Sequence, residues 1–203
     1  MLTIYAPIFL LLPWTVLSES QLPVAKCQYP LPSSPGLNIS AVVGDTFKYI
    51  YTPNSMLFKA VDSITMMIKR IPNMDNVYSE VLKARSVFGT QTKMNFNVTD
   101  LGNGILKKIT KAGEKSYLAS IVGMKGDICL LYVCSDQGED KGDDLRYVIA
   151  RPWVDPAMVK HPDVLFRSIN LKYNFRGKFR KLPQRWLSKL LSKKKTEPSV
   201  NSV

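Results

Sequence analysis

The sequence predicts an all-β protein, an eight-stranded antiparallel up-and-down barrel with a C-terminal helix packed outside it and a basic tail. Turn-forming stretches such as IPNMDN, DLGNG and MKGD separate short runs of strand-like alternation. A meander of such strands leaves two unpaired edges, and closure into a barrel removes both. The expected strands span residues 43–52, 62–71, 76–87, 91–99, 104–111, 115–123, 127–135 and 144–152.

Length and composition fit one compact domain. The chain has 203 residues, of which 45% are hydrophobic and 22% charged, ample for one hydrophobic core and short for two. We expect the barrel domain to occupy residues 21–170, preceded by a separate segment at 1–20 and followed by a tail at 171–203. Asp155 can cap a helix that begins at Pro156 and packs against the outside of the barrel.

The first segment, MLTIYAPIFLLLPWTVLSES, is uncharged up to Ser18, contains two prolines and ends in small residues. This pattern is typical of a secretory signal peptide. The alternative is a transmembrane anchor, which needs about 20 consecutive apolar residues. Pro7, Pro13 and the shortness of the run favour the signal peptide, so the sequence predicts a secreted, extracellular protein.

In a secreted protein, cysteines can form disulfides and asparagines in suitable motifs can be glycosylated. An oxidising compartment favours one disulfide among Cys27, Cys129 and Cys134, with one thiol left over. No pair has CxxC spacing, so no zinc site is expected. Asn38 in NIS and Asn97 in NVT are candidate glycosylation sites.

The last predicted strand, LRYVIAR, carries a charge on its apolar face. Leu145, Tyr147 and Ile149 point to one side because strand side chains alternate, and Arg151 falls on that same side. A guanidinium can stack on a ring while donating hydrogen bonds, so Arg151 can close an apolar barrel end. The alternative is a strand-end arginine that reaches solvent.

The strand YVIAR, the earlier strand LLYVC and the stretch VVGDTFKY together resemble the lipocalin family, most closely its insect and apolipoprotein D type. The resemblance covers roughly residues 27–169. It implies that Arg151 packs on an aromatic residue of the first strand and closes the barrel. The family has a tryptophan where this chain has Thr46. A one-residue irregularity after Gly44 would let Phe47 supply the ring instead.

The resemblance also implies a disulfide between Cys27 and Cys134. If Cys134 faces outward, strand alternation turns Cys129, Leu131 and Val133 inward. Cys129 is then expected to be a small, buried, unreactive side chain.

The predicted function is that of a secreted carrier for a small hydrophobic ligand such as a fatty acid, sterol, retinoid or pigment. Apolar walls with a few hydroxyl groups suit such a ligand. The alternative is a barrel filled by the same side chains. The predicted lining residues are Phe47, Tyr49, Tyr51, Leu118, Ser120, Val122, Cys129, Leu131, Val133, Leu145, Tyr147 and Ile149.

No enzymatic activity, metal or cofactor is expected. His161 is the only histidine and lies beyond the barrel strands, so no Ser-His-Asp or metal-histidine cluster can form around it. Some lipocalins are isomerases with a thiol in the cavity, but nothing near Cys129 in the sequence would lower its pKa.

The tail supports a second hypothesis, a surface-interaction protein with a filled, non-binding barrel. Residues 171–195 contain ten Lys or Arg and no acidic residue. Leu182, Trp186 and Leu190 recur at helical spacing beside a basic stripe. Such a helix could bind an anionic membrane or a sulfated glycan, whereas nucleic acid is a poor partner for a secreted chain. The simpler alternative is a solvated, partly disordered tail.

Overall fold

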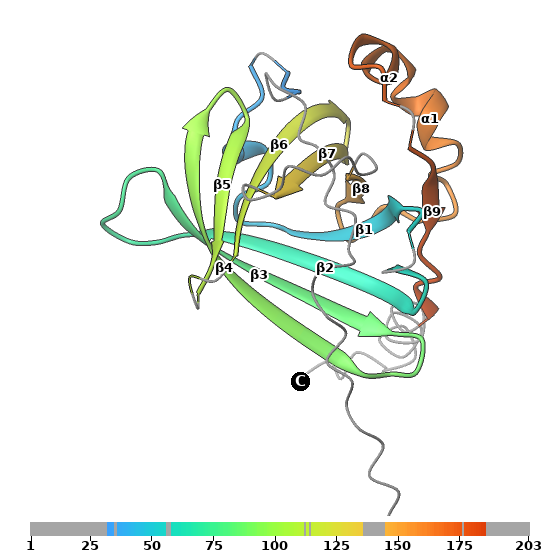
Figure 1. The fold of residues 1–203 in the computed structure, drawn as a ribbon, viewed down its shortest axis with the longest axis horizontal. Coiled ribbons are helices and arrows are strands. Elements are labelled where there is room, and N and C mark those ends of the chain that lie inside the picture. Colours follow the sequence, from blue (N-terminus) through green and yellow to red (C-terminus); the bar gives the residue numbers. More distant parts are fainter. Residues whose placement is uncertain are drawn as a thin grey trace, which may run out of the picture.

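The structure, a computed structural model, describes residues 32–34, 36–55, 58–111, 113, 115–135, 145–175 and 177–185. It is a closed, antiparallel, up-and-down barrel of eight strands, which confirms the predicted fold class. Figure 1 shows the strands wrapping around a common interior. The barrel strands are β1 (Thr46–Pro53), β2 (Val61–Arg70), β3 (Val77–Ser86), β4 (Gln91–Gly102), β5 (Ile105–Thr110), β6 (Ser116–Lys125), β7 (Ile128–Ser135) and β8 (Arg146–Ala150).

Each strand from β2 to β8 pairs with the next along the chain, and β1 closes the ring by pairing with both β8 and β2. The β1–β2 pairing spans only the first part of β1, where Phe47 lies opposite Met66. Closure leaves no exposed edge along this part of the sheet. A short 3-10 helix, Ile39–Ala41, precedes β1, and its cap residue Asn38 accepts a hydrogen bond from the backbone N–H of Ser40.

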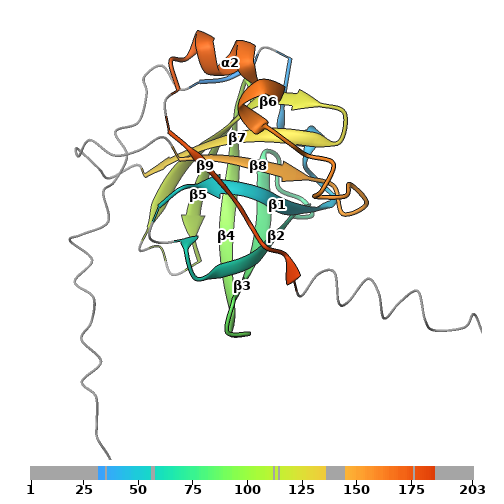
Figure 2. The same cartoon turned by 90° about the vertical axis from the view of Figure 1, so that its right-hand side faces the viewer.

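A ninth strand occupies the seam where β1 and β2 separate. This strand, β9 (Phe179–Lys181), pairs with the last part of β1, and Figure 2 shows it running across β1. The following residues continue into the seam. The backbone N–H of Leu182 donates to the Ile50 carbonyl, and the backbone N–H of Gln184 donates to the Asp62 carbonyl. The prediction of a separate tail from residue 171 is therefore wrong for residues 177–185, because these residues complete the barrel wall. Residues 186–203 lie outside the described part of the chain.

Two short helices, α1 (Pro162–Leu165) and α2 (Arg167–Lys172), stand beside the barrel. Gly123 on β6 permits the close approach of α2, since a Cβ atom there would lie 2.1 Å from Ile169 Cδ1. The helix expected at Pro156 does not form. Asp155 instead accepts a hydrogen bond from the Ala157 N–H in a turn, and the helix begins at Pro162. Neither of these helices has the length and hydropathy to cross a membrane, and no other described helix has them.

The core consists of two layers separated by the barrel wall. We call the first the interior cluster; its buried members are Ile39, Val42, Phe47, Tyr49, Phe58, Ile64, Met66, Ile68, Tyr78, Phe96, Val98, Leu106, Ala119, Ile121, Cys129, Leu131, Ile149 and Leu182. The second, the outer cluster, lies between the wall and the C-terminal segment; its buried members are Ile50, Tyr51, Val122, Leu130, Tyr132, Cys134, Val148, Ala150, Val159, Phe166 and Phe175. One sheet therefore buries apolar residues on both faces over β1, β6, β7 and β8.

Candidate functional site

The barrel interior brings together most of the predicted lining residues. The alternation of strand side chains turns these residues inward along β7, along β8 and along the first half of β1. Val133 and Tyr147 are partly buried and pack against the interior cluster. The predicted lining residues that the structure places inside are Phe47, Tyr49, Cys129, Leu131, Val133, Tyr147 and Ile149.

Tyr51 was predicted to line the interior, and this is wrong. The β1–β8 register shifts between Tyr49 and Tyr51, and such an irregularity reverses the alternation that follows it. Tyr51 therefore lies in the outer cluster, where its hydroxyl donates to the Val159 carbonyl at 2.8 Å. The sequence shows continuous aromatic alternation here and contains no signal for the shift.

The inward face of β6 was also predicted wrongly. Leu118 and Val122 pack in the outer cluster, and Ser120 shares their strand parity. The residues that face inward are Tyr117, Ala119 and Ile121. Both faces of β6 are apolar and buried, so alternation alone could not distinguish them. Leu145 precedes β8, is half-buried and belongs to neither cluster.

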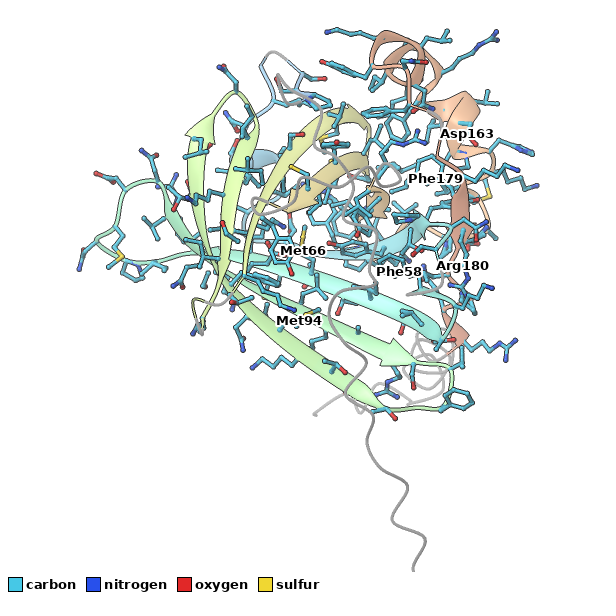
Figure 3. All side chains as sticks on the ribbon, viewed as in Figure 1. Phe58, Met66, Met94, Asp163, Phe179 and Arg180 are labelled. Atoms are coloured by element: carbon cyan, nitrogen blue, oxygen red, sulfur yellow. The ribbon has the colours of Figure 1, made fainter. Side chains whose placement is uncertain are left out.

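Three aromatic rings meet inside the barrel near the β1–β2 connection. The Tyr147 ring lies edge-on to Tyr49, with centroids 5.4 Å apart, and edge-on to Phe58, with centroids 5.8 Å apart. Phe58 belongs to the connection itself and is only 9% exposed, so its ring covers one end of the interior. Figure 3 labels Phe58 and Met66 within the barrel. Burial is the main cause that raises the pKa of both Tyr49 and Tyr147 well above the ordinary tyrosine value.

Arg151 lies at the opposite end of the barrel. Its guanidinium carbon is 5.3 Å from the Phe47 ring centroid and 5.5 Å from the Trp153 ring centroid. The guanidinium forms one ion pair with Asp45 and a second with Asp127, whose Oδ1 lies 3.3 Å from Arg151 Nε. The side chain is 20% exposed, so it lies across the barrel end and does not extend into solvent. Such an arrangement can close an apolar interior at this end.

A buried ion pair inside the barrel was not predicted from the sequence. Lys108 Nζ on β5 lies 2.7 Å from Glu80 Oε2 on β3. Glu80 lies opposite Phe96 and Ile68 in the two neighbouring pairings, and both of these residues belong to the interior cluster. The signal was present, because Glu80 interrupts an apolar alternation just as Arg151 does. The described part of the interior is therefore amphipathic, because the Glu80–Lys108 pair lies among apolar side chains.

Cys129 is a free, fully buried thiol of the interior cluster. Burial raises its pKa to about 12, which keeps it protonated near neutral pH. A protonated thiol is a poor nucleophile, so the surroundings of Cys129 do not activate it for covalent chemistry. Among the described residues no group of three or more His, Cys, Asp or Glu is placed to hold a metal ion.

Comparison with known proteins finds solved structures that are similar to this one, whereas comparison of the sequence finds no match. No family model matches the chain, and no curated protein matches it. The cockroach allergen Per a 4 superposes with a TM-score of 0.53 at 13% identity, covering 78% of this chain and 91% of the allergen. The lobster protein apocrustacyanin A1 gives a TM-score of 0.50 at 14% identity, covering 78% and 88% of the two chains. Apocrustacyanin C1 gives 0.52 at 14% identity, covering 79% and 89%.

The chain has the lipocalin fold. The resemblance stated from the strands YVIAR and LLYVC is therefore confirmed at the level of the fold. Identities of 13% and 14% say nothing further about chemistry. In this lipocalin fold the β1 ring that packs against the Arg151 guanidinium belongs to Phe47.

Proposed function

We propose that the chain is a secreted carrier that holds a small, largely hydrophobic ligand inside its barrel. The observation that carries the proposal is the interior cluster itself, to which every barrel strand contributes an apolar or aromatic side chain. Arg151 lies across one end and Phe58 over the other. A ligand within would be held mainly by the burial of its apolar surface, at roughly 25 cal/mol per Å².

The carrier proposal is tested with the neutral fluorescent probe N-phenyl-naphthylamine on delipidated, folded protein. We expect saturable binding with a Kd of about 1 μM or lower, and competition by long-chain lipids. Replacing Tyr147 by Ala should weaken probe binding, because the ring packs against both Tyr49 and Phe58 inside the barrel. Absence of saturable binding to the delipidated protein would contradict the proposal.

Tyr132 provides the matched control for Tyr147. It is also a buried tyrosine, on the neighbouring strand, but it belongs to the outer cluster and stacks on Phe175 with centroids 5.5 Å apart. Tyr132→Ala should lower the free energy of unfolding while leaving the Kd of the probe unchanged. If both variants weaken binding equally, the effect comes from lost stability and not from a site.

Export, a Cys27–Cys134 disulfide and glycosylation at Asn38 and Asn97 belong to the same proposal. Cys134 faces the outer cluster while Cys129 faces inward, and both asparagines are exposed. Cys27 and the expected signal peptide lie outside the described residues. A bridge closing a loop of about 100 residues should stabilise the fold by about 2–5 kcal/mol. Non-reducing peptide mapping of protein secreted from eukaryotic cells tests all three features, and recovery of a Cys27–Cys129 peptide would contradict the pairing.

The second candidate function is contact with an anionic membrane or a sulfated glycan through the basic C-terminal region. The observation in its favour is that Lys172, Lys178, Lys181 and Arg185 are exposed on the segment that leads to residues 186–203. Arg180 belongs to the wall instead, since it donates to the backbone carbonyls of Lys59 and Val61. The two functions use different surfaces of the molecule, so they can be tested separately.

A further inference from the structure

Two opposite charges face each other inside the barrel, Glu80 on β3 and Lys108 on β5. Glu80 is 1% exposed and Lys108 is 6% exposed. Their position follows from strand register, because β4 lies between β3 and β5 and places apolar residues beside both. Glu80 lies opposite Phe96, and Lys108 lies opposite Val98 and, on the other side, Tyr117. The ring of Phe96 in turn contacts that of Tyr117, with centroids 6.1 Å apart.

The carboxylate of Glu80 is incompletely satisfied. Lys108 Nζ lies 2.7 Å from Oε2, yet among the described residues neither carboxylate oxygen accepts a hydrogen bond of good geometry. The nearby Tyr49 hydroxyl directs its proton to Met66 Sδ at 3.7 Å instead. Lys108 has three N–H donors, and its contact with Glu80 Oε2 is an ion pair and not a hydrogen bond of good geometry. The pair therefore presents a bare acceptor, Oε1, next to an ammonium.

A buried ion pair with unsatisfied hydrogen-bonding atoms lowers the stability of the fold unless another group supplies the missing hydrogen bonds. Removing two charges from water costs several kcal/mol per ion, and the attraction between them offsets this only when further hydrogen bonds satisfy the remaining atoms. A buried acceptor without a donor also carries its own desolvation cost. The interior of a carrier is the place where a ligand could supply the missing partner.

We propose that Glu80 and Lys108 form a head-group site for a neutral amphipathic lipid with a terminal hydroxyl, which donates to Glu80 Oε1 and accepts from Lys108 Nζ. This inference rests on the proposed carrier function and specifies its ligand class. A hydroxyl has one donor and two acceptor positions, so one group can satisfy both partners. Long-chain alcohols and sterols belong to this class.

Charge balance selects a neutral head group over an ionised one. The ion pair has no net charge, so a bound carboxylate would leave one uncompensated negative charge in an apolar interior. A bound ammonium would leave one uncompensated positive charge. Either excess charge is expensive at low dielectric. The site therefore favours an alcohol over a fatty acid or a fatty amine of the same chain length.

The test is displacement of N-phenyl-naphthylamine from the full mature protein by four ligands with the same chain: tetradecanol, its methyl ether, tetradecanoate and tetradecylammonium. At neutral pH tetradecanol should displace the probe at concentrations lower by about tenfold or more than each of the other three. The methyl ether keeps the acceptor oxygen and loses the O–H, so it reports on the bond to Glu80 Oε1 alone. Equal displacement by all four ligands would overturn the inference while leaving the carrier proposal intact. Failure of the probe itself to bind would overturn the carrier proposal.

Single substitutions should change the preference in opposite directions. Glu80→Gln leaves the ammonium unpaired and should shift the preference to tetradecanoate, whereas Lys108→Gln leaves the carboxylate and should shift it to tetradecylammonium. The matched controls are Asp75→Asn and Lys83→Gln, which change the net charge equally at exposed positions and should keep the preference for the alcohol. A preference that does not change in either interior variant would overturn the inference.

Removal of one partner can prevent folding, because it leaves a buried charge unpaired. The double variant Glu80→Met with Lys108→Met avoids this problem, since apolar residues of similar volume often replace a buried pair without loss of stability. It should bind the probe and show no preference between tetradecanol and its methyl ether. If the double variant keeps the full preference for the alcohol, the head group is recognised elsewhere and the assignment to Glu80 and Lys108 is wrong.

Discussion

Two arginine side chains lie against aromatic rings on opposite faces of the barrel wall. Arg151 faces one end of the interior and packs on Phe47. Arg146, five residues earlier and of opposite strand parity, faces outward. It is 2% exposed, with its guanidinium carbon 4.8 Å and 4.7 Å from the ring centroids of Phe175 and Phe179. β8 and the residue that follows it therefore place two arginines of opposite parity, one across the barrel end and one against the rings of the C-terminal segment.

Arg151→Met should lower the free energy of unfolding by about 1–3 kcal/mol, because it removes the stacking on Phe47 and the ion pairs with Asp45 and Asp127. Urea denaturation measures the change. Arg151→Lys keeps one positive charge and loses the planar stacking, so we expect an intermediate loss of stability. If Arg151→Met is as stable as the wild type, Arg151 contributes nothing to closure.

Three protonated groups in the interior should make the protein sensitive to alkali. The pKa of Cys129 rises from about 9 to about 12 in the folded state, and those of Tyr49 and Tyr147 are also raised. The unfolded chain therefore loses these protons at a lower pH than the folded chain. The contribution of these three groups to stability should therefore fall as the pH rises above about 9, by up to about 1.4 kcal/mol per pH unit for each group.

Cys129→Ala separates the contribution of the thiol from that of the tyrosines. Between pH 9 and pH 10 the wild type should lose about 1 kcal/mol more stability than this variant, whatever their difference at neutral pH. Chemical denaturation at a series of pH values gives the comparison. Identical pH profiles would show that Cys129 ionises equally easily in both states.

At the scale of elements, β1 is shared between three partners. It pairs with β2 at its start, with β8 in its middle and with β9 at its end. Residues after β9 complete the seam, since the side chain of Gln184 donates to the Tyr49 carbonyl at 2.7 Å and Leu182 enters the interior cluster. Figure 3 labels Phe179 and Arg180 where β9 meets the barrel. The C-terminal segment up to residue 185 is therefore part of the barrel wall.

Leu182→Ala should cost about 2–5 kcal/mol of stability, because a side chain that is 2% exposed leaves a cavity when it is truncated. Leu171→Ala is the matched control: Leu171 is 72% exposed, and its loss should change stability by less than about 0.5 kcal/mol. Thermal or urea unfolding measures both. Equal effects at the two positions would contradict the role of residues 177–185 in the wall.

At the scale of the whole molecule, the carrier function and the surface function can be separated by truncation. A chain that ends at residue 185 retains β9 and the seam, so it should unfold at the same urea concentration as the full chain and bind the fluorescent probe equally well. It loses the four lysines of residues 186–203, and its binding to heparin or to anionic vesicles should fall if the tail is a contact surface. Equal heparin and vesicle binding by both chains would contradict the surface function. A chain that ends at residue 175 should fail to fold.

The sequence by itself determined the eight strands, their antiparallel order and the place of Arg151, because turn residues and two-residue alternation are local signals. The same alternation placed Cys129, Leu131 and Val133 on the inner face of β7. Only the tertiary structure decided which way β6 faces, because the C-terminal segment buries its outer side and makes both faces apolar. Register decided the rest: a shift in the β1–β8 pairing turned Tyr51 outward, and pairings across three strands brought Glu80 to Lys108. Both depend on contacts between residues far apart in the chain. The sequence shows that Glu80 interrupts an apolar face, but it does not show that Lys108 is its partner.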